Sequence, residues 1–335
     1  MSESVRVIRR SRRWGLDSPY AFLLPAVLVF GTFALYPILR SLYLSFFWYE
    51  FLRPEQMHWV GLGNYREMLH DERVTAWPGL VPPKGPLAWW QVVCYPLVVL
   101  WTTVNTPGGA FWNSIRFTVM YVPATLVVPL LLAVLVERAG RLSTLFRTLN
   151  FIPVVVSVAV VSIIWLWIYH PEYGVVNTLL RMVAGRGAGA AWLSDPQLAM
   201  PAIAAMCVWH GLGFNMLLYL VGLQRIPPEL AEAARVDGAT GWQAFRAVTL
   251  PLLKPTIFLI GLLATIGALK VFGQMYIMTG GGPGDSTLSM VLYLYNVAFR
   301  YGRFRFGYAS ALAWALAAFI FLVSLVAFRL SRERE

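Results

Sequence analysis

Residues 229–255 read ELAEAARVDGATGWQAFRAVTLPLLKP, a polar stretch set between two apolar runs that are each long enough to cross a bilayer. Just before it, Pro227 and Pro228 suit the first turn of a helix, where the missing N–H groups are not needed. Glu229 and Glu232 add negative charge near the positive end of that helix. The sequence therefore predicts a short helix that begins here, outside the membrane.

A second short helix is predicted directly after the first. Gly238 stands where a residue in the left-handed conformation ends many helices. Thr240 and Gln243 have the Thr-x-x-Gln spacing of a capping box, which marks the start of the next helix. Pro251 and Pro255 interrupt that helix before the following apolar run begins. Two short helices should therefore meet at a sharp turn.

The junction of these helices carries small and apolar side chains, Ala233, Ala234 and Val236. An ordinary solvated connection would explain the polarity of the loop but not two closely capped helices. A knob of small and apolar residues suits insertion into the cleft of a partner protein. We therefore expect something outside the membrane to bind this loop.

Six apolar runs account for most of the chain. It has 335 residues, of which 58% are hydrophobic and 13% charged, so it lies outside the usual range of soluble proteins. Each run approaches or exceeds the roughly 20 residues that cross a bilayer as a helix. We expect an all-α integral membrane protein with six transmembrane helices. The runs are 20–39, 112–136, 149–169, 199–224, 256–278 and 307–328.

All 16 Asp and Glu residues fall outside these runs. Carboxylates inside the membrane mark most proton and ion relays, so their absence argues against a proton-coupled carrier. A stand-alone carrier driven by another gradient, a channel for a small polar solute, and a membrane scaffold without transport remain alternatives.

The basic residues sort by side of the membrane. Alternate loops and ends carry 15 Lys and Arg on one side and 9 on the other, leaving out Arg40, which directly follows the first run. The richer side should be cytoplasmic, which places both ends of the chain inside. Residues 1–18 then form a basic cytoplasmic N-terminus and 329–335 a cytoplasmic tail. Arg300, Arg303 and Arg305 break the rule, because they precede the last run on the outer side.

The outer segment 49–111 contains a second hydrophobic patch at 87–104, with Pro96 in its middle. Counting it as a seventh span would place the Arg-rich stretch 137–147 outside, so we expect a patch that lies in the outer interface or covers a pore mouth.

A glycine-rich stretch at 279–285, TGGGPGD, should end the fifth run as a turn, since Gly and Pro cannot continue a helix there.

The chain lacks the phosphate-binding loop that ATP-driven transport needs. Such a loop ends in Gly-Lys, whereas the three lysines follow Pro83, Leu253 and Leu269. We therefore expect no catalysis, no metal and no cofactor in this chain. If transport uses ATP and Mg²⁺, another polypeptide hydrolyses the nucleotide.

The loop 225–255 resembles the EAA loop of ABC importer permeases. The shared pattern is Glu-Ala-Ala at 232–234, Gly238 after three residues, and Val-Thr-Leu-Pro at 248–251 after nine more, with Val248 where the family has Ile. The stretches WVGLGNY at 59–65 and TGGGP at 279–283 are similar to those of carbohydrate importers of the maltose and glycerol phosphate type, in the first of their two permease subunits. The resemblance covers about 18–328, except an apparent insertion at about 73–109.

This resemblance implies a type I ABC importer permease fold with both ends inside, in the cytoplasmic membrane of a bacterium or archaeon. The implied partners are a second permease subunit, an ATPase dimer on the cytoplasmic face, an extracytoplasmic solute-binding protein and membrane lipid, with no role for nucleic acid. One ATPase subunit would receive the loop as a coupling helix. The residues implied in that contact are Glu232, Ala233, Ala234, Asp237, Gly238, Leu250 and Pro251.

Candidate substrate contacts are polar groups at membrane depth, where each is costly without a partner or ligand. His210 and Lys270 lie near the middle of their runs, Asn215 and Gln274 are close to them, and Trp209 and Phe214 offer flat faces. Sugars bind through hydroxyl hydrogen bonds and by stacking on aromatic rings, which suits this inventory. The alternatives are structural: a hydrogen bond between helices for His210, a backbone carbonyl for Lys270, and packing for the aromatic rings.

The resemblance also implies where substrate contacts lie. In permeases of the maltose type, substrate contacts lie on the third, fourth and fifth runs. Several polar residues at those positions are replaced here by Val or Cys. We therefore expect the place of the substrate pocket to carry over, but not its specificity. The implied positions are Val154, Val158, Cys207, His210, Gly211 and Phe214, with Gly267 and Val271 in the fifth run. Ser157, next to Val158, is a further candidate for the substrate path.

Overall fold

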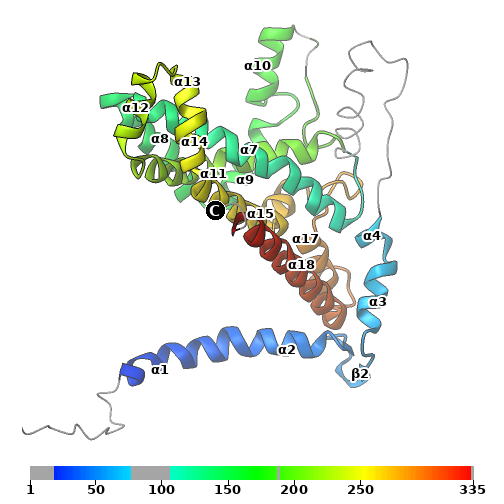
Figure 1. Ribbon diagram of the computed structural model, residues 1–335. Coiled ribbons are helices and arrows are strands. Elements are labelled where there is room, and N and C mark those ends of the chain that lie inside the picture. The colour runs from blue at the N-terminus through cyan, green and yellow to red at the C-terminus, as the bar shows by residue number, and fades with distance from the viewer. Residues whose placement is uncertain (1–18, 77–105, 186, 188, 333–335) are drawn as a thin grey trace, which may run out of the picture.

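The computed structural model describes residues 19–76, 106–185, 187 and 189–332, and it is built almost entirely of helices (Figure 1). A two-residue antiparallel hairpin pairs Phe47 with Trp59 and Trp48 with His58. The elements in chain order are α1 (Pro19–Phe30), the π-helical turn η1 (Gly31–Leu35), α2 (Tyr36–Leu44), β1 (Phe47–Trp48), η2 (Pro54–Gln56), β2 (His58–Trp59), α3 (Gly63–His70), α4 (Glu72–Thr75), α7 (Ala110–Arg138), η3 (Gly140–Leu142), α8 (Ser143–Val155), α9 (Val158–Ile168), α10 (Val175–Ala184), α11 (Ala199–Gln224), α12 (Pro228–Val236), α13 (Gly241–Ala244), the π-helical turn η4 (Phe245–Thr249), α14 (Leu250–Leu252), α15 (Lys254–Leu269), α16 (Gly273–Met278), α17 (Met290–Phe299) and α18 (Phe306–Arg332).

Four helices of the described residues are long and apolar enough to cross a membrane: Leu23–Leu44, Ala110–Glu137, Ala199–Gln224 and Phe306–Ser331. Two bent pairs pass the same test together, Ser143–Val155 with Val158–Ile168 and Gly241–Leu252 with Lys254–Leu269. Counting each bent pair as one span gives six, in agreement with the predicted number. The fourth predicted run, 199–224, coincides with α11. The first helix runs on from the predicted end at 39 to Leu44, and Arg40 donates to the Tyr36 hydroxyl one turn back.

The runs 149–169 and 256–278, each predicted as one span, are not continuous helices. The third span is bent by 101° between α8 and α9. The fifth is bent by 65° at Leu253, before α15. Its helix then breaks after Leu269, so that α16 is a separate short helix. Pro153 lies in the last turn of α8 and Pro255 in the first turn of α15. Each break frees backbone groups at membrane depth, and these need partners from elsewhere in the fold.

The centre of the bundle is the packing of α7 against α11, with α8 and α15 against the same pair. The approach of α8 to α11 is very close at Gly213, where a Cβ would stand 2.1 Å from the carbonyl oxygen of Asn150. Small residues at such crossings allow the backbones to approach closely inside membranes. A hydrogen bond also joins α11 to α7, since the Tyr219 hydroxyl donates to the Leu126 carbonyl at 3.0 Å.

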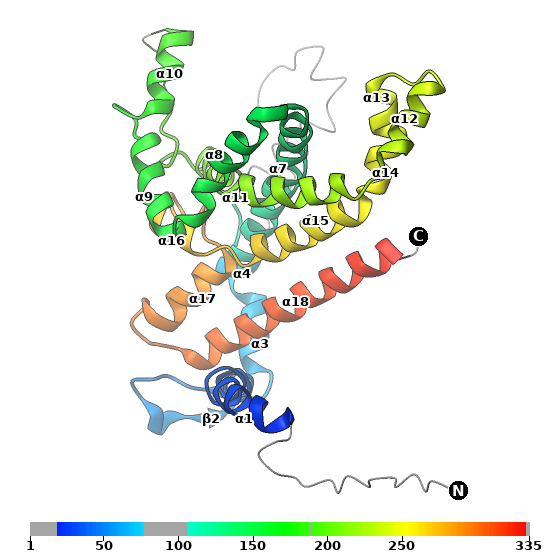
Figure 2. The same cartoon turned by 90° about the vertical axis from the view of Figure 1, so that its left-hand side faces the viewer.

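The two views show how the elements divide between the sides of the bundle. In Figure 2, α12–α14 and the end of α18 lie on the right, whereas α10, α16 and α17 lie on the left. The helix α1–α2 extends away from the body in Figure 1 and is exposed along its apolar length. The polar helix pair predicted in 225–255 therefore lies on the same side as the C-terminal end of the last span.

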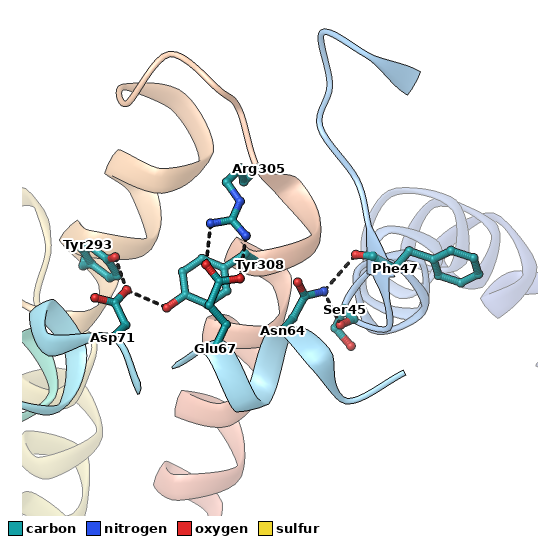
Figure 3. Close-up of polar contacts among 8 residues, drawn as sticks. All are labelled: Ser45, Phe47, Asn64, Glu67, Asp71, Tyr293, Arg305 and Tyr308. Atoms are coloured by element: carbon teal, nitrogen blue, oxygen red, sulfur yellow. Dashed lines mark hydrogen bonds and ion pairs between the residues drawn. The ribbon is translucent and has the colours of Figure 1, made fainter. Parts of the chain in front are cut away.

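On the opposite side, α3 and α4 are held to the last two helices by acidic side chains (Figure 3). Arg305 donates to both carboxylate oxygens of Glu67, at 2.7 and 2.6 Å. Asp71 accepts from the hydroxyls of Tyr293 and Tyr308. Burial, reinforced by the hydrogen bond to Asp71, raises the pKa of Tyr293 above its ordinary value of about 10, so that the hydroxyl keeps its proton and donates.

The stretch 59–65 has a structural role in this clamp. Asn64 is buried, and its amide donates to the carbonyls of Ser45 at 2.8 Å and Phe47 at 2.9 Å (Figure 3). These bonds fasten α3 to the end of α2 and to the hairpin. Each such bond contributes on the order of 1 kcal/mol to stability. The predicted patch at 87–104 lies outside the described residues, but the flanks of that segment are joined by a bond from the Gly109 N–H to the Ala76 carbonyl at 2.8 Å.

Candidate functional site

The predicted helix pair in 225–255 is present as α12 and α13. Pro228 opens α12, and after α12 ends the Asp237 N–H donates to the Ala233 carbonyl and the Ala239 N–H to the Ala234 carbonyl. Gly238 adopts a φ of +85°, the left-handed conformation that ends helices and that glycine reaches without strain. The predicted left-handed turn at this position is confirmed.

The predicted capping box of α13 is also confirmed. The Thr240 hydroxyl accepts from the Gln243 N–H at 3.4 Å, and the Gln243 side chain accepts from the Thr240 N–H at 2.7 Å. The chain then turns through η4 and α14 into the bend that precedes α15. Because both ends of the turn are fixed by local bonds, α12 has a defined direction relative to the fifth span.

The tip of this loop is open to solvent. Val236 is 87% exposed, Trp242 is 67% exposed, and Glu232, Ala233, Asp237 and Gly238 are exposed as well. Beneath the tip, a cavity of about 330 Å³ lies between α7, the end of α11 and the loop, lined among others by Glu137, Glu232 and Phe245. Of the remaining predicted contact residues, Ala234 and Leu250 are half-buried and Pro251 is exposed. The geometry is that of a projecting knob with a hollow at its base.

At the break of the third span, His210 of α11 holds the freed backbone. Its Nε2 lies 3.2 Å from the carbonyl oxygen of Val156, so Nε2 carries the proton and donates to this carbonyl. Ser157 caps the start of α9 by accepting from the Val160 N–H at 3.5 Å. The structural alternative for His210, a hydrogen bond between helices, is therefore what the structure shows.

At the break of the fifth span, Ser289 plays the equivalent part. Its hydroxyl is buried and donates to the carbonyl of Val271 at 2.7 Å. Lys270, the residue directly after the end of α15, is exposed. A Cβ at Gly267, one turn earlier, would meet no atom within 4 Å, so α15 leaves open space beside this end of the helix.

The two breaks lie against each other. The short helix α16 packs on α9 and also touches α11. A Cβ at Gly273 would lie 3.5 Å from the nearest methyl of Val158, which places the start of α16 beside the start of α9. The third, fourth and fifth spans therefore meet where two helices are interrupted, and backbone irregularity at such depth is tolerated where it is buried in protein or lines a water-filled cavity.

The other candidates of the substrate path divide into exposed and buried residues. Trp209 and Phe214 are exposed, and Trp209 makes an edge contact with Trp165 at 5.5 Å between ring centroids. Asn215 bonds back to the Gly211 carbonyl at 2.9 Å. Cys207 and Val271 are buried in the main hydrophobic core, away from any open surface. Val154 and Gln274 are half-buried.

Several residues of this region were not among the candidates. Ser289 follows the glycine turn and gives no sign in the sequence that it bonds to a carbonyl 18 residues earlier. Phe272 and Tyr276 stand four residues apart and stack at 5.5 Å, and Tyr295 contacts both of them. The spacing of Phe272 and Tyr276 was visible in the sequence, but their meeting with α17 depends on the glycine turn.

That turn is held by the outer end of α7. The amide of Asn113 donates to the carbonyls of Asp285 at 2.8 Å and Leu288 at 3.2 Å. The Ser114 hydroxyl accepts from the Met290 N–H at 2.9 Å. Gly280, Gly281 and Gly284 have positive φ, as expected for a turn that ends α16. The second span thus fixes α17 next to the break of the fifth.

The chain is similar to known membrane components of transport systems. The family model described as "binding-protein-dependent transport system inner membrane component" matches residues 108–333. The lactose transport system permease protein LacF of Rhizobium radiobacter is 32% identical over 319 residues, which cover 94% of this chain and 94% of that protein. The probable ABC transporter permease protein YurN of Bacillus subtilis is 34% identical over 310 residues, covering 92% and 94%.

A solved structure of a similar fold is that of a bacterial alginate ABC transporter in complex with an alginate pentasaccharide-bound periplasmic protein. One of its chains matches with a TM-score of 0.71 and 21% identity, covering 94% of this chain and 93% of that chain. At this identity the match shows the fold. The family match and the two relatives show that the chain belongs to the binding-protein-dependent transport system inner membrane components, as a permease subunit of an ABC importer.

Proposed function

We propose that this permease subunit carries a sugar, a mono- or oligosaccharide or a polyol, across the cytoplasmic membrane of a bacterium or archaeon, and that a separate ATPase drives it through the loop 225–255. The observation that carries the proposal is the exposed, doubly capped helix pair α12–α13, which projects on the side where α18 ends. A protein without a phosphate-binding loop needs such a contact to receive work from a nucleotide-hydrolysing partner.

The path is proposed to pass the two interrupted spans. There His210, Ser157 and the exposed Lys270 surround backbone that is no longer helical, and Trp209 and Phe214 offer exposed rings. Hydrogen-bonding groups beside aromatic faces are the usual means of binding sugars. The relative from Rhizobium radiobacter is named for lactose transport, and the solved structure is that of an alginate transporter. Both names support a carbohydrate as the substrate.

The proposed assembly has four kinds of component. A second, similar permease would complete the path, and the exposed apolar helix α1–α2 offers a surface for it and for lipid. An ATPase dimer would bind ATP and Mg²⁺ and take the knob of α12 on the cytoplasmic face. A solute-binding protein would deliver the sugar from outside, as the periplasmic protein stands in complex with the alginate transporter.

Closure of the ATPase dimer would push α12 and so change which side of the membrane the path opens to. Such a change needs two arrangements of packed elements, one of which the nucleotide-bound ATPase favours. The loop is suited to this because α12 packs on η4, and η4 leads through α14 into the bend before α15.

Reconstitution tests the proposal. Vesicles with this permease, its partner permease, the ATPase and the binding protein are expected to accumulate labelled sugar from a mixed panel when ATP is inside them. Vesicles with this permease alone should accumulate none. Uptake by the single chain without ATPase would contradict the proposal and favour a stand-alone carrier or channel.

A further inference from the structure

An unbroken row of aromatic rings leads outward from the break of the fifth span. Phe272 stacks on Tyr276 with ring centroids 5.5 Å apart. Tyr295 of α17 lies 5.1 Å from Phe272 and 5.4 Å from Tyr276, and Phe299 follows at 5.3 Å from Tyr295. We call these four residues the aromatic lane.

The lane is accessible. Tyr276 is 38% exposed and Phe299 51% exposed, while Phe272 and Tyr295 are half-buried beneath them. Tyr276 and Tyr295, whose rings meet at 5.4 Å, each carry a phenolic hydroxyl. The row therefore presents open ring faces together with polar hydroxyl groups, the mixture that binds sugar rings.

Two basic side chains, Arg300 and Lys270, accompany the aromatic lane. The Arg300 guanidinium carbon lies 5.7 Å from the centre of the Tyr276 ring, and Arg300 is exposed. Lys270 is exposed two residues before Phe272, next to the open space at Gly267. In the part of the chain that the structure describes, Glu67 with Arg305 is the ion pair found, so neither Arg300 nor Lys270 has a carboxylate partner there.

The outer arginines that break the positive-inside rule thus differ in their surroundings. Arg305 is neutralised by the two oxygens of Glu67 and serves the clamp of α3. Arg303 is exposed and lines a hollow beside the hairpin, away from the lane. Arg300 lies over a ring of the aromatic lane, and since no carboxylate of the described residues pairs with it, its N–H donors can bind a ligand. A guanidinium binds carboxylates and similar anions through paired hydrogen bonds.

We propose that the aromatic lane, with Arg300 and Lys270, is a binding surface for an anionic sugar, one that carries a carboxylate or sulfonate group. The inference rests on the proposed function and names the class of substrate within it. The sugar rings stack on Tyr276 and Phe299, and the anionic group is held first by Arg300 and then by Lys270 as the sugar approaches the break of the fifth span. Charge complementarity selects this occupant over a neutral sugar.

The test uses the complete importer in lipid nanodiscs. A glucuronic acid–glucose disaccharide and its neutral glucose–glucose counterpart are titrated, and binding is followed by saturation-transfer difference NMR. One charge-assisted bond predicts about tenfold tighter binding of the acidic sugar. Arg300→Gln is expected to remove this preference, Tyr276→Ala to weaken both sugars, and Arg303→Gln, the matched control three residues away, to change neither.

Equal binding of both sugars to the unaltered importer, no binding of either, or a preference that survives Arg300→Gln would overturn the inference, and the lane would then be a contact with lipid or with the second permease. ATP-driven uptake from a panel of neutral sugars is measured in parallel. Uptake without an acidic preference leaves the importer function intact and overturns the lane alone. Absence of any ATP-driven sugar uptake by the complete importer counts against the proposed function itself.

Discussion

Glu232→Lys is expected to lower ATP-driven uptake by at least about tenfold while the chain still inserts and folds, because reversing one charge at a docked surface costs several kcal/mol. Glu232 is exposed on α12, so the lysine meets no steric obstacle in the isolated subunit. The side chain lines the hollow under the loop together with Glu137, so the two carboxylates give this surface negative charge for a basic group of the partner. Uptake in reconstituted vesicles and co-purification of the ATPase are the measurements.

The matched control for this prediction is Glu229→Lys. Glu229 is exposed on the same helix, but it does not line the hollow. The control variant should keep most of the uptake and most of the bound ATPase. If Glu232→Lys transports as well as the control does, Glu232 has no part in coupling.

Gly213→Ala is expected to destabilise the subunit by about 3 kcal/mol, the size of a severe overpacking defect. The new Cβ would stand 2.1 Å from the Asn150 carbonyl oxygen and 2.7 Å from its carbon, and both are backbone atoms of α8 that cannot rotate away. The helices α8 and α11 would have to separate, and with them the bond between His210 and Val156. Thermal unfolding in detergent, followed by fluorescence size-exclusion chromatography, measures the loss.

Gly261→Ala provides the comparison. Gly261 lies in α15, and a Cβ there would be 3.7 Å from a methyl of Leu126, an ordinary contact. This variant should unfold at the temperature of the unaltered protein. Equal melting of the two alanine variants would show that α8 and α11 are not held as closely as the structure has them.

Contiguous elements connect the loop 225–255 to the proposed path. The helix α12 touches η4, and α14 enters the 65° bend at the start of α15. The far end of α15 is the break at Lys270, beside α16 and α9. In the proposed mechanism, a push on α12 would thus reach α15, whose other end borders the proposed path. Coupling between distant sites needs such a chain of packed elements with two arrangements.

Local chemistry in the sequence was sufficient to predict the loop. Proline at a first turn, Gly238 with a positive φ, and the Thr240–Gln243 box act within a few residues, and all three are present in the structure. The run 199–224 was predicted to its ends because α11 contains no Asp, Glu, Lys or Arg and lies between polar loops. These features depend on neighbours along the chain, which a single sequence displays directly.

The breaks in the third and fifth spans were not predictable in the same way. Hydropathy identifies a run that crosses the membrane but not where its helix stops, and here the freed carbonyls are satisfied by His210 and Ser289, which lie 54 and 18 residues away. The clamp of Asp71 on Tyr293 and Tyr308 spans more than 200 residues and has no local sign either. Such pairings belong to the tertiary fold.

The central claim is that α12 docks into the ATPase, and photo-crosslinking from Val236 tests it most directly. A benzophenone amino acid at this 87% exposed position should form an adduct of the mass of this subunit plus the ATPase. The same group at Val183, 90% exposed on α10 at the other side of the bundle, should form none with the ATPase. An ATPase adduct from Val183, or no adduct from Val236 in an importer that transports, would contradict the account.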